Sequence, residues 1–280
     1  MKKMMFVVLV VLQFLVMTKV TYAYTENNPP ISLQVNGNYI KMDVEPYIHN
    51  NTTLVPIRFV SEALGAKNIS WDSKTKTVTI TMDETTIKMA IGEEIVYVNG
   101  KTYKISVPAQ VKNNRTFVPL RFIAETLNCE VEWNQETYTV NIKKDDVIVP
   151  DELVTNKSYR DDEMYWLARI IEAESGGEPF DGKLAVGNVV LNRRESSEFP
   201  NTIYSVIFDK KYGTQFSPVA DKTIYKNPSN SSIIAAKMVL EGVNNIGESC
   251  YFLNPDRSTS FWIMKNRKLY TIINRHYFYL

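Results

Sequence analysis

Cysteine and histidine are scarce in this chain. Its 280 residues include 2 Cys and 2 His. Cys129 and Cys250 lie in different halves, so they cannot form a disulfide framework, and stability must come from packed cores; one bridge between the halves is an alternative. A structural or catalytic zinc site needs several His or Cys ligands close together. The sequence offers no such set, so we expect no metal and no cofactor.

The chain also lacks an excess of positive charge. It carries 32 Lys and Arg against 31 Asp and Glu. Three of those lysines belong to an N-terminal leader, and without them 29 basic residues face 31 acidic ones, a net charge near −2. Proteins that bind nucleic acids or anionic lipids through their charge carry a basic surplus. We therefore expect no nucleic-acid partner.

Long apolar runs are absent except near the N-terminus. Lys2 and Lys3 precede the apolar residues 4–17, and a small residue, Ala23, follows. This pattern is typical of a secretory signal peptide, and the apolar run is shorter than the ~20 residues that a spanning helix needs. We expect residues 1–23 to be cleaved and the mature protein to be secreted, without membrane contact; the alternative is an uncleaved anchor.

The N-terminal half contains an internal repeat. Residues 50–80, "NNTTLVPIRFVSEALGAKNISWDSKTKTVTI", align with residues 113–142, "NNRTFVPLRFIAETLNCEVEWNQETYTVNI". Asn-Gly pairs at Asn36 and Asn99 predict two-residue hairpins. In each repeat a "VP" pair precedes a short helix, and a strand containing Trp follows. Residues 24–144 are therefore predicted to be a strand-rich α+β domain made of two repeats.

This half resembles the copper amine oxidase N-terminal domain family. The shared "VPxRFxxExL" core and the strand containing Trp carry the resemblance. His49 is the only His in this half and has no nearby ligand set, so the sequence offers no copper site. The resemblance implies an extracellular accessory module for wall targeting or spacing. Residues 145–160, polar and broken by Pro150, are predicted to be a linker.

The C-terminal half, residues 161–280, begins with a predicted helix, "DDEMYWLARIIEAES". At about 100° per residue, Glu174 shares a face with Ile170 and Ile171, whereas Glu172 lies on the opposite face as a solvated charge. Burial raises the pKa of a carboxyl and keeps it protonated, as a general acid requires. The alternative is that Glu174 forms a structural ion pair.

The order of motifs in residues 163–280 resembles the catalytic domain of the SleB family of cell wall hydrolases, which includes spore cortex-lytic enzymes. The motifs are "LARIIEAESGGEPFDGKLAVGNVVLNR", "FPNTIYSVIF", "QFSPVAD" and "YFLNP". The resemblance implies a small lysozyme-like α+β fold. It also implies cleavage of peptidoglycan between N-acetylmuramic acid and N-acetylglucosamine, as a lytic transglycosylase associated with the wall or spore cortex.

Within that resemblance, Glu174 is the first Glu of the family's "AExxGE" motif and is implied to be the single acid/base. The other residues that fall in recurring motifs are implied to bind substrate: Glu178, Gln215, Ser217, Tyr251 and Asn254. Four alternatives stay open: simple hydrolysis with Glu178 as a second carboxylate, an amidase or peptidase acting on the stem peptide, a Cys-His peptidase using Cys250, and a wall-binding protein without activity. Cys250 lies in the apolar "CYFL" segment, which predicts an inert, buried thiol.

Overall fold

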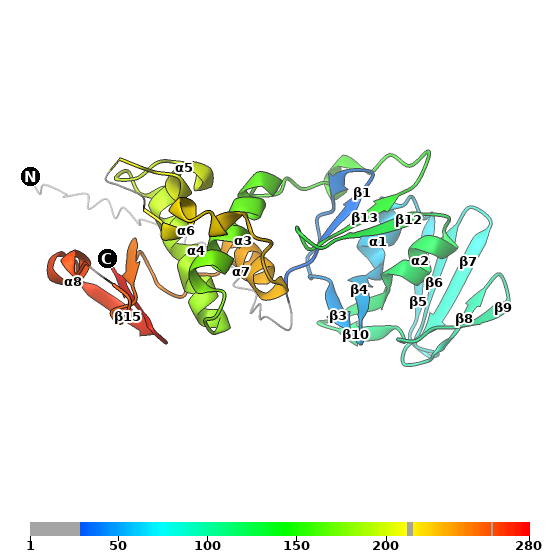
Figure 1. Cartoon of the computed structure of the whole chain (residues 1–280). Coiled ribbons are helices and arrows are strands. Elements are labelled where there is room, and N and C mark those ends of the chain that lie inside the picture. Colours follow the sequence, from blue (N-terminus) through cyan, green and yellow to red (C-terminus); the bar gives the residue numbers. More distant parts are fainter. Residues whose placement is uncertain (1–28, 212–214, 259) are drawn as a thin grey trace, which may run out of the picture.

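The computed structural model describes residues 29–211, 215–258 and 260–280. Figure 1 shows a strand-rich N-terminal half beside a helical C-terminal half. The elements β15 and α8 lie at the end of the helical half that is farthest from the N-terminal half. The predicted signal peptide, residues 1–23, lies outside the described residues. The α+β class predicted from the sequence is confirmed.

Among the described residues, no helix combines the length and the apolar character required to cross a bilayer.

The strand-rich half pairs its strands in three sheets, ordered β12-β13-β1-β2, β10-β11-β4-β3 and β5-β6-β7-β8-β9. Its elements are β1 (Ser32–Val35), β2 (Asn38–Tyr39), β3 (Tyr47–His49), β4 (Thr52–Pro56), α1 (Ile57–Ala63), β5 (Asn68–Asp72), β6 (Thr77–Met82), β7 (Thr85–Ala90), β8 (Ile95–Val98), β9 (Lys101–Lys104), β10 (Gln110–Lys112), β11 (Arg115–Pro119), α2 (Leu120–Thr126), β12 (Glu130–Asn134) and β13 (Thr139–Lys143).

The two repeats fold alike and join through equivalent strands. Each repeat runs strand, helix, strand, strand, as β4-α1-β5-β6 and β11-α2-β12-β13. The first strands pair with each other in antiparallel register, with Val55 opposite Val118. Both predicted Asn-Gly hairpins are confirmed, because Asn36 and Asn99 have positive φ angles of 48° and 49° and connect paired strands. Left-handed backbone at both central residues is what a type I′ turn requires.

The helical half is built around three packed helices, α3, α4 and α7. Its elements are α3 (Asp161–Ser175), α4 (Phe180–Glu195), α5 (Ile203–Ile207), α6 (Ser217–Ala220), η2 (Thr223–Tyr225), α7 (Asn230–Leu240), β14 (Tyr251–Leu253), α8 (Trp262–Asn266), β15 (Leu269–Ile273) and β16 (His276–Tyr279).

A glycine allows the three helices to approach closely. A Cβ atom on Gly187 of α4 would lie 2.8 Å from Cδ1 of Ile171 on α3 and 3.2 Å from Cγ2 of Val239 on α7. Real Cβ atoms essentially never approach as closely as the first distance, and the second is also tight, so a larger residue would require the Ile171 and Val239 side chains or the helices to shift. Gly187 thus lets α4 pack closely against α3 and α7.

The two halves share one packed core. A single buried cluster includes Leu33 and Val140 from the strands together with Leu167 and Met238 from the helices. The predicted linker, residues 145–160, is bonded to β2 rather than extended. It contains η1 (Asp151–Leu153), and the backbone N–H of Thr155 donates to the Tyr39 carbonyl at 2.9 Å.

Candidate active site

Glu174 is a half-buried carboxyl in the last turn of α3. Its helix face contains Leu167, Ile170 and Ile171, all fully buried. Burial raises the pKa of Glu174 to about 7, the positive charge of Arg193 opposes the rise, and the negative charge of Asp221 adds to it. The predicted placement on the core-facing side agrees with this environment. At neutral pH the carboxyl is therefore about half protonated and able to donate a proton.

The start of α3 explains why this helix is firmly placed. The Glu163 carboxylate accepts a hydrogen bond from the backbone N–H of Arg160 at 2.8 Å, just before the first turn. Asp161, Asp162 and Glu163 put negative charge at the positive end of the helix dipole. These interactions favour a helix that begins at Asp161, which fixes the angular position of Glu174 further along.

Glu172 does not have the environment predicted for it, and the prediction of a solvated charge is wrong. Its Oε2 accepts hydrogen bonds from Ser229 N at 3.0 Å, Ser229 Oγ at 2.5 Å and Ser232 Oγ at 2.7 Å. Those hydrogen bonds lower the pKa of Glu172, although partial burial opposes them. Glu172 thus lies at the N-terminus of α7 and ties it to α3, a contact that helical spacing within α3 cannot reveal.

Arg193 is the central side chain near Glu174, and the sequence analysis missed it. Arg193 is 5% exposed on α4, and its Nε donates to the Cys250 carbonyl at 2.7 Å. Its guanidinium lies 5.0 Å from the Phe216 ring centre and 5.8 Å from that of Tyr251. Helical spacing contained a usable signal, because Arg193 follows the buried Val189 by four residues and Val190 by three, on one face of α4.

Tyr251 and the segment that carries Gln215 and Ser217 lie near Arg193. Gln215 and Ser217 flank the buried Phe216, whose ring faces the guanidinium. The Tyr251 hydroxyl accepts a hydrogen bond from Arg267 at 2.7 Å. Ser217 begins the short helix α6, and residues 212–214, directly before Gln215, lie outside the described residues. The structure therefore brings Glu174, the Phe216 segment and Tyr251 to one region.

Glu178 lies in a different setting from Glu174. Its carboxylate forms an ion pair with Arg275 at 3.0 Å and accepts a hydrogen bond from Asn274, both in the turn between β15 and β16. Burial works against ionisation, but the Asn274 hydrogen bond and the charges of His276 and Arg275 lower the pKa of Glu178. Glu178 is therefore ionised near neutral pH and joined to the hairpin.

Asn254 organises its own turn. Its Oδ1 accepts a hydrogen bond from the Asp256 backbone N–H at 3.0 Å, as in an Asx turn. Its backbone carbonyl accepts hydrogen bonds from the backbone N–H groups of Arg257 and Ser258. The side-chain oxygen is thus already used within the loop after β14.

The two cysteines are free thiols. Cys129 is buried and Cys250 is half-buried rather than fully buried as its apolar segment predicted. Burial raises the pKa of the Cys250 thiol, and the nearby Arg193 lowers it only in part. A raised pKa disfavours the thiolate that a nucleophile needs. Within the described residues, no group of His, Cys, Asp and Glu has an arrangement that could hold a metal ion.

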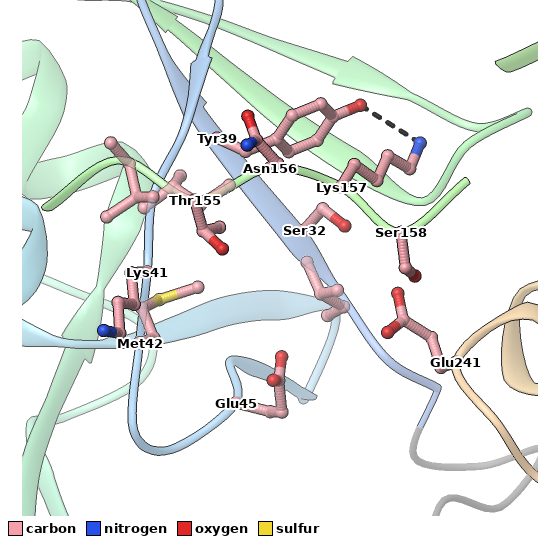
Figure 2. A pocket seen from close by; sticks show the side chains of 13 residues that line it. Ser32, Tyr39, Lys41, Met42, Glu45, Thr155, Asn156, Lys157, Ser158 and Glu241 are labelled. Carbon is pink, nitrogen blue, oxygen red and sulfur yellow. Dashed lines mark hydrogen bonds between the residues drawn. The ribbon is translucent and has the colours of Figure 1, made fainter. Parts of the chain in front are cut away.

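A separate cavity of about 240 Å³ lies where the two halves meet. The carboxyl groups of Glu45 and Glu241 both line it, and Lys157 donates a hydrogen bond to the Tyr39 hydroxyl at its edge (Figure 2). Burial raises the pKa of Glu45 to about 7. The negative charge of Glu241 raises this pKa further, whereas the positive charge of Lys237 opposes the rise. None of the predicted site residues lines this cavity, so it belongs to the joint between the halves.

Comparison with known proteins divides the chain in the same way. Residues 177–279 match the family model described as Cell Wall Hydrolase, and residues 34–142 match the one described as Copper amine oxidase N-terminal domain. The first match begins after Glu174 and includes the five residues implied to bind substrate.

Curated relatives match over part of the chain. The spore cortex-lytic enzyme of Bacillus cereus is 40% identical over 108 residues, which is 38% of this chain and 39% of that protein. The spore cortex-lytic enzyme of Bacillus subtilis is 38% identical over 97 residues, 35% of this chain and 31% of that protein. The chain thus spans less than half the length of these relatives.

A solved structure is also similar. The crystal structure of the catalytic domain of the Bacillus cereus SleB protein matches with 36% identity and a TM-score of 0.40, covering 44% of this chain and 92% of that one. Together the family models identify residues 34–142 as a copper amine oxidase N-terminal domain and residues 177–279 as a Cell Wall Hydrolase domain.

Proposed function

We propose that this protein degrades peptidoglycan by cleaving its glycan strands, with Glu174 as the single acid/base. The observation that carries the proposal is the half-buried carboxyl of Glu174, whose pKa is raised to about 7 at the edge of a Cell Wall Hydrolase domain. A group that titrates near the working pH can both give and take a proton. The spore cortex-lytic relatives support cortex peptidoglycan as the substrate and the wall or cortex as the place of action, after secretion.

The proposed reaction is that of a lytic transglycosylase. Protonated Glu174 donates its proton to the oxygen between N-acetylmuramic acid and N-acetylglucosamine, and that C–O bond breaks. The muramic acid carbon develops oxocarbenium character. The Glu174 carboxylate then accepts the proton of the C6 hydroxyl on the same sugar, and the C6 oxygen closes a 1,6-anhydro ring. One carboxyl serves both steps, and water is not consumed.

The setting of Glu178 supports the single-carboxyl scheme over hydrolysis with two carboxyls. A glycosidase of the ordinary kind uses a second carboxylate as base or nucleophile. Glu178 is ionised, as such a base or nucleophile must be, but its carboxylate is engaged by Arg275 and Asn274 in the turn between β15 and β16. Glu178→Gln is therefore expected to lower turnover less than Glu174→Gln, which removes the proposed proton donor.

Mass spectrometry of digested walls tests the proposal. Purified cortex and vegetative peptidoglycan are each incubated with the wild-type protein and with Glu174→Gln. Anhydro-muropeptides from the wild type and none from Glu174→Gln are expected, with cortex digested faster. Reducing-end muramic acid from the wild type would instead show hydrolysis. Release of free stem peptides that a chelator abolishes and zinc restores would show an amidase. If neither wall yields any product, the protein binds the wall without cleaving it.

For the copper amine oxidase N-terminal domain we propose wall targeting, the role that the resemblance implies. Tethering an enzyme to an insoluble polymer raises its local concentration at the substrate. Residues 24–160, which keep the segment bonded to β2, are expected to sediment with purified peptidoglycan. If they stay in the supernatant, the domain is a spacer.

A further inference from the structure

Arg193 is a buried cation that bonds and stacks within the Glu174 region. The side chain is 5% exposed, and its Nε–H donates to the Cys250 carbonyl at 2.7 Å. Three aromatic rings surround the guanidinium, with centres 5.1 Å away for Phe199, 5.0 Å for Phe216 and 5.8 Å for Tyr251. Within the described part of the chain, its buried Nη1 has no hydrogen-bond partner.

These contacts connect segments that are distant in the sequence. Arg193 lies on α4, Phe216 precedes α6, and Cys250 and Tyr251 lie at the start of β14. A guanidinium is planar and presents several N–H donors in a rigid fork, so it can bond a carbonyl while its faces stack on rings. An ammonium group on a flexible stem cannot do both. Arg193 therefore fixes the positions of both segments relative to α4.

The charged groups around Glu174 come from two further elements. Arg193 on α4 is positive, and Asp221, directly after α6, is negative. The groups around Arg193 are Cys250 and Tyr251 at β14, Glu174 on α3, and Asp209 after α5. A buried cation is costly unless its surroundings compensate for the lost hydration. Here the carbonyl, the rings and the opposite charges offset part of that cost, although burial still lowers the pKa of Arg193.

We propose that Arg193 is a positioning residue of this active site: it holds the Phe216 segment and Tyr251 in place around Glu174 and presents a positive charge to the Glu174 carboxyl. This inference rests on the proposed function for its effect on turnover. The charge favours the carboxylate that remains after Glu174 has donated its proton. The bonds and rings keep the surrounding side chains in the geometry that a reacting sugar needs.

The positive charge of Arg193 moves the pH dependence of turnover in a defined direction. Turnover needs protonated Glu174, so the rate falls as pH rises through the pKa of this carboxyl. Because Arg193 lowers that pKa, removing its charge must move the alkaline fall in rate to higher pH. A residue with only a structural role would lower the rate at every pH and leave the position of the fall unchanged.

The experiment compares three variants of the full-length protein over pH 5 to 9 on soluble glycan fragments. Arg193→Met removes the charge, Arg193→Lys keeps the charge without the planar fork, and Arg194→Met is the matched control. Arg194 is the next residue on α4, but it pairs with Glu163 and Glu195 instead. Far-UV and near-UV circular dichroism establish that each variant is folded.

For Arg193→Met we expect an alkaline fall displaced upward by about half a pH unit or more and a loss in kcat of about tenfold or more. Arg193→Lys should keep the fall at the wild-type pH yet lose kcat by a similar factor. Arg194→Met should match the wild type in both. An unchanged fall in folded Arg193→Met overturns the charge part, and full activity of Arg193→Lys overturns the positioning part.

A second measurement does not depend on turnover. Carbon-13 NMR of the labelled carboxyl can follow the titration of Glu174 in the wild type, in Arg193→Met and in Arg193→Lys. If Arg193→Met does not fold, Arg193→Gln serves as the uncharged variant. The titration should move to higher pH in the uncharged variant and stay in place in Arg193→Lys. If the wild type cleaves no wall, the proposed function fails, while this titration still decides whether Arg193 acts on Glu174.

Discussion

The Nζ atom of Lys237 lies 2.8 Å from the Thr137 carbonyl oxygen, across the boundary between the helical and the strand-rich half. The same ammonium donates to Ser32 Oγ at 2.8 Å and to the Tyr138 carbonyl at 3.1 Å. The Lys237 side chain is fully buried, and this burial lowers its pKa to about 7. A desolvated cation with all its donors engaged joins the two domains.

Lys237→Ala should therefore destabilise the whole chain. The change leaves a cavity and removes the donor from three acceptors, which together cost about 2–4 kcal/mol in the free energy of unfolding. Urea denaturation followed by fluorescence measures it, with Lys265→Ala on the exposed surface of α8 as the control. Equal midpoints for the two variants would contradict the role of Lys237 in the joint.

The lowered pKa of Lys237 makes its contribution to the stability of the fold depend on pH. Its folded pKa is about 7 against a normal value of 10.5. Between these values the unfolded chain binds more protons than the folded one, so the contribution of Lys237 to stability rises with pH from about 7 to about 10. Lys237→Met should remove this rise. Equal slopes for the wild type and Lys237→Met over that range would show that burial does not lower the pKa of Lys237.

The joint also changes what is expected of an isolated catalytic fragment. A flexible linker at residues 145–160 would leave the two halves independent, but a fragment that begins at Asp161 exposes Lys237 and the core surface that faces the strand-rich half. We expect the fragment to melt several degrees below the full chain, because it loses buried contacts. Calorimetry of residues 161–280 beside the full-length protein tests this. A fragment that melts with the full chain would restore the independent arrangement.

Glu174→Gln should be more stable than the wild type at alkaline pH. The folded-state pKa of Glu174 is raised from 4.5 to about 7, so the stability that its neutral form contributes is complete below pH 4.5 and is lost as pH rises through 7. Above pH 7.5 the ionised carboxylate costs about 2–3 kcal/mol relative to a neutral group. Thermal melts from pH 5 to 8 should show a Tm gap that widens with pH. A constant gap would mean that Glu174 ionises normally.

Glu172→Ala should lower stability while leaving the rate per folded molecule nearly unchanged. The substitution removes the acceptor for Ser229 and Ser232 at the start of α7, a loss of about 1–2 kcal/mol. Since the folded-state pKa of Glu172 is lowered, its contribution is present above pH 4.5 and disappears as pH falls further. Glu84→Ala, in an exposed turn, is the control for denaturation. A loss of turnover without loss of stability would assign Glu172 to the chemistry.

Several features followed from the sequence because they depend on neighbours in the chain. The period of an α-helix decided that Glu174 lies with Ile170 and Ile171 and away from Glu172. Asn-Gly pairs determined the hairpin turns at Asn36 and Asn99 through their tolerance of left-handed backbone. Similarity between the two repeats determined that they fold alike, because the same local preferences act twice.

Other features were decided only by the tertiary structure. The first strand, β1, pairs in parallel with the last strand of its domain, β13, with Leu33 opposite Val140. Glu172 faces solvent on an isolated α3, yet α7 brings Ser229 against it. Arg193 and Lys237 are buried because rings and carbonyls from distant segments surround them. Helical period specifies the side of a helix on which a residue lies, whereas the partner on that side depends on how the whole chain packs, and the partner determines whether a charge is catalytic or structural.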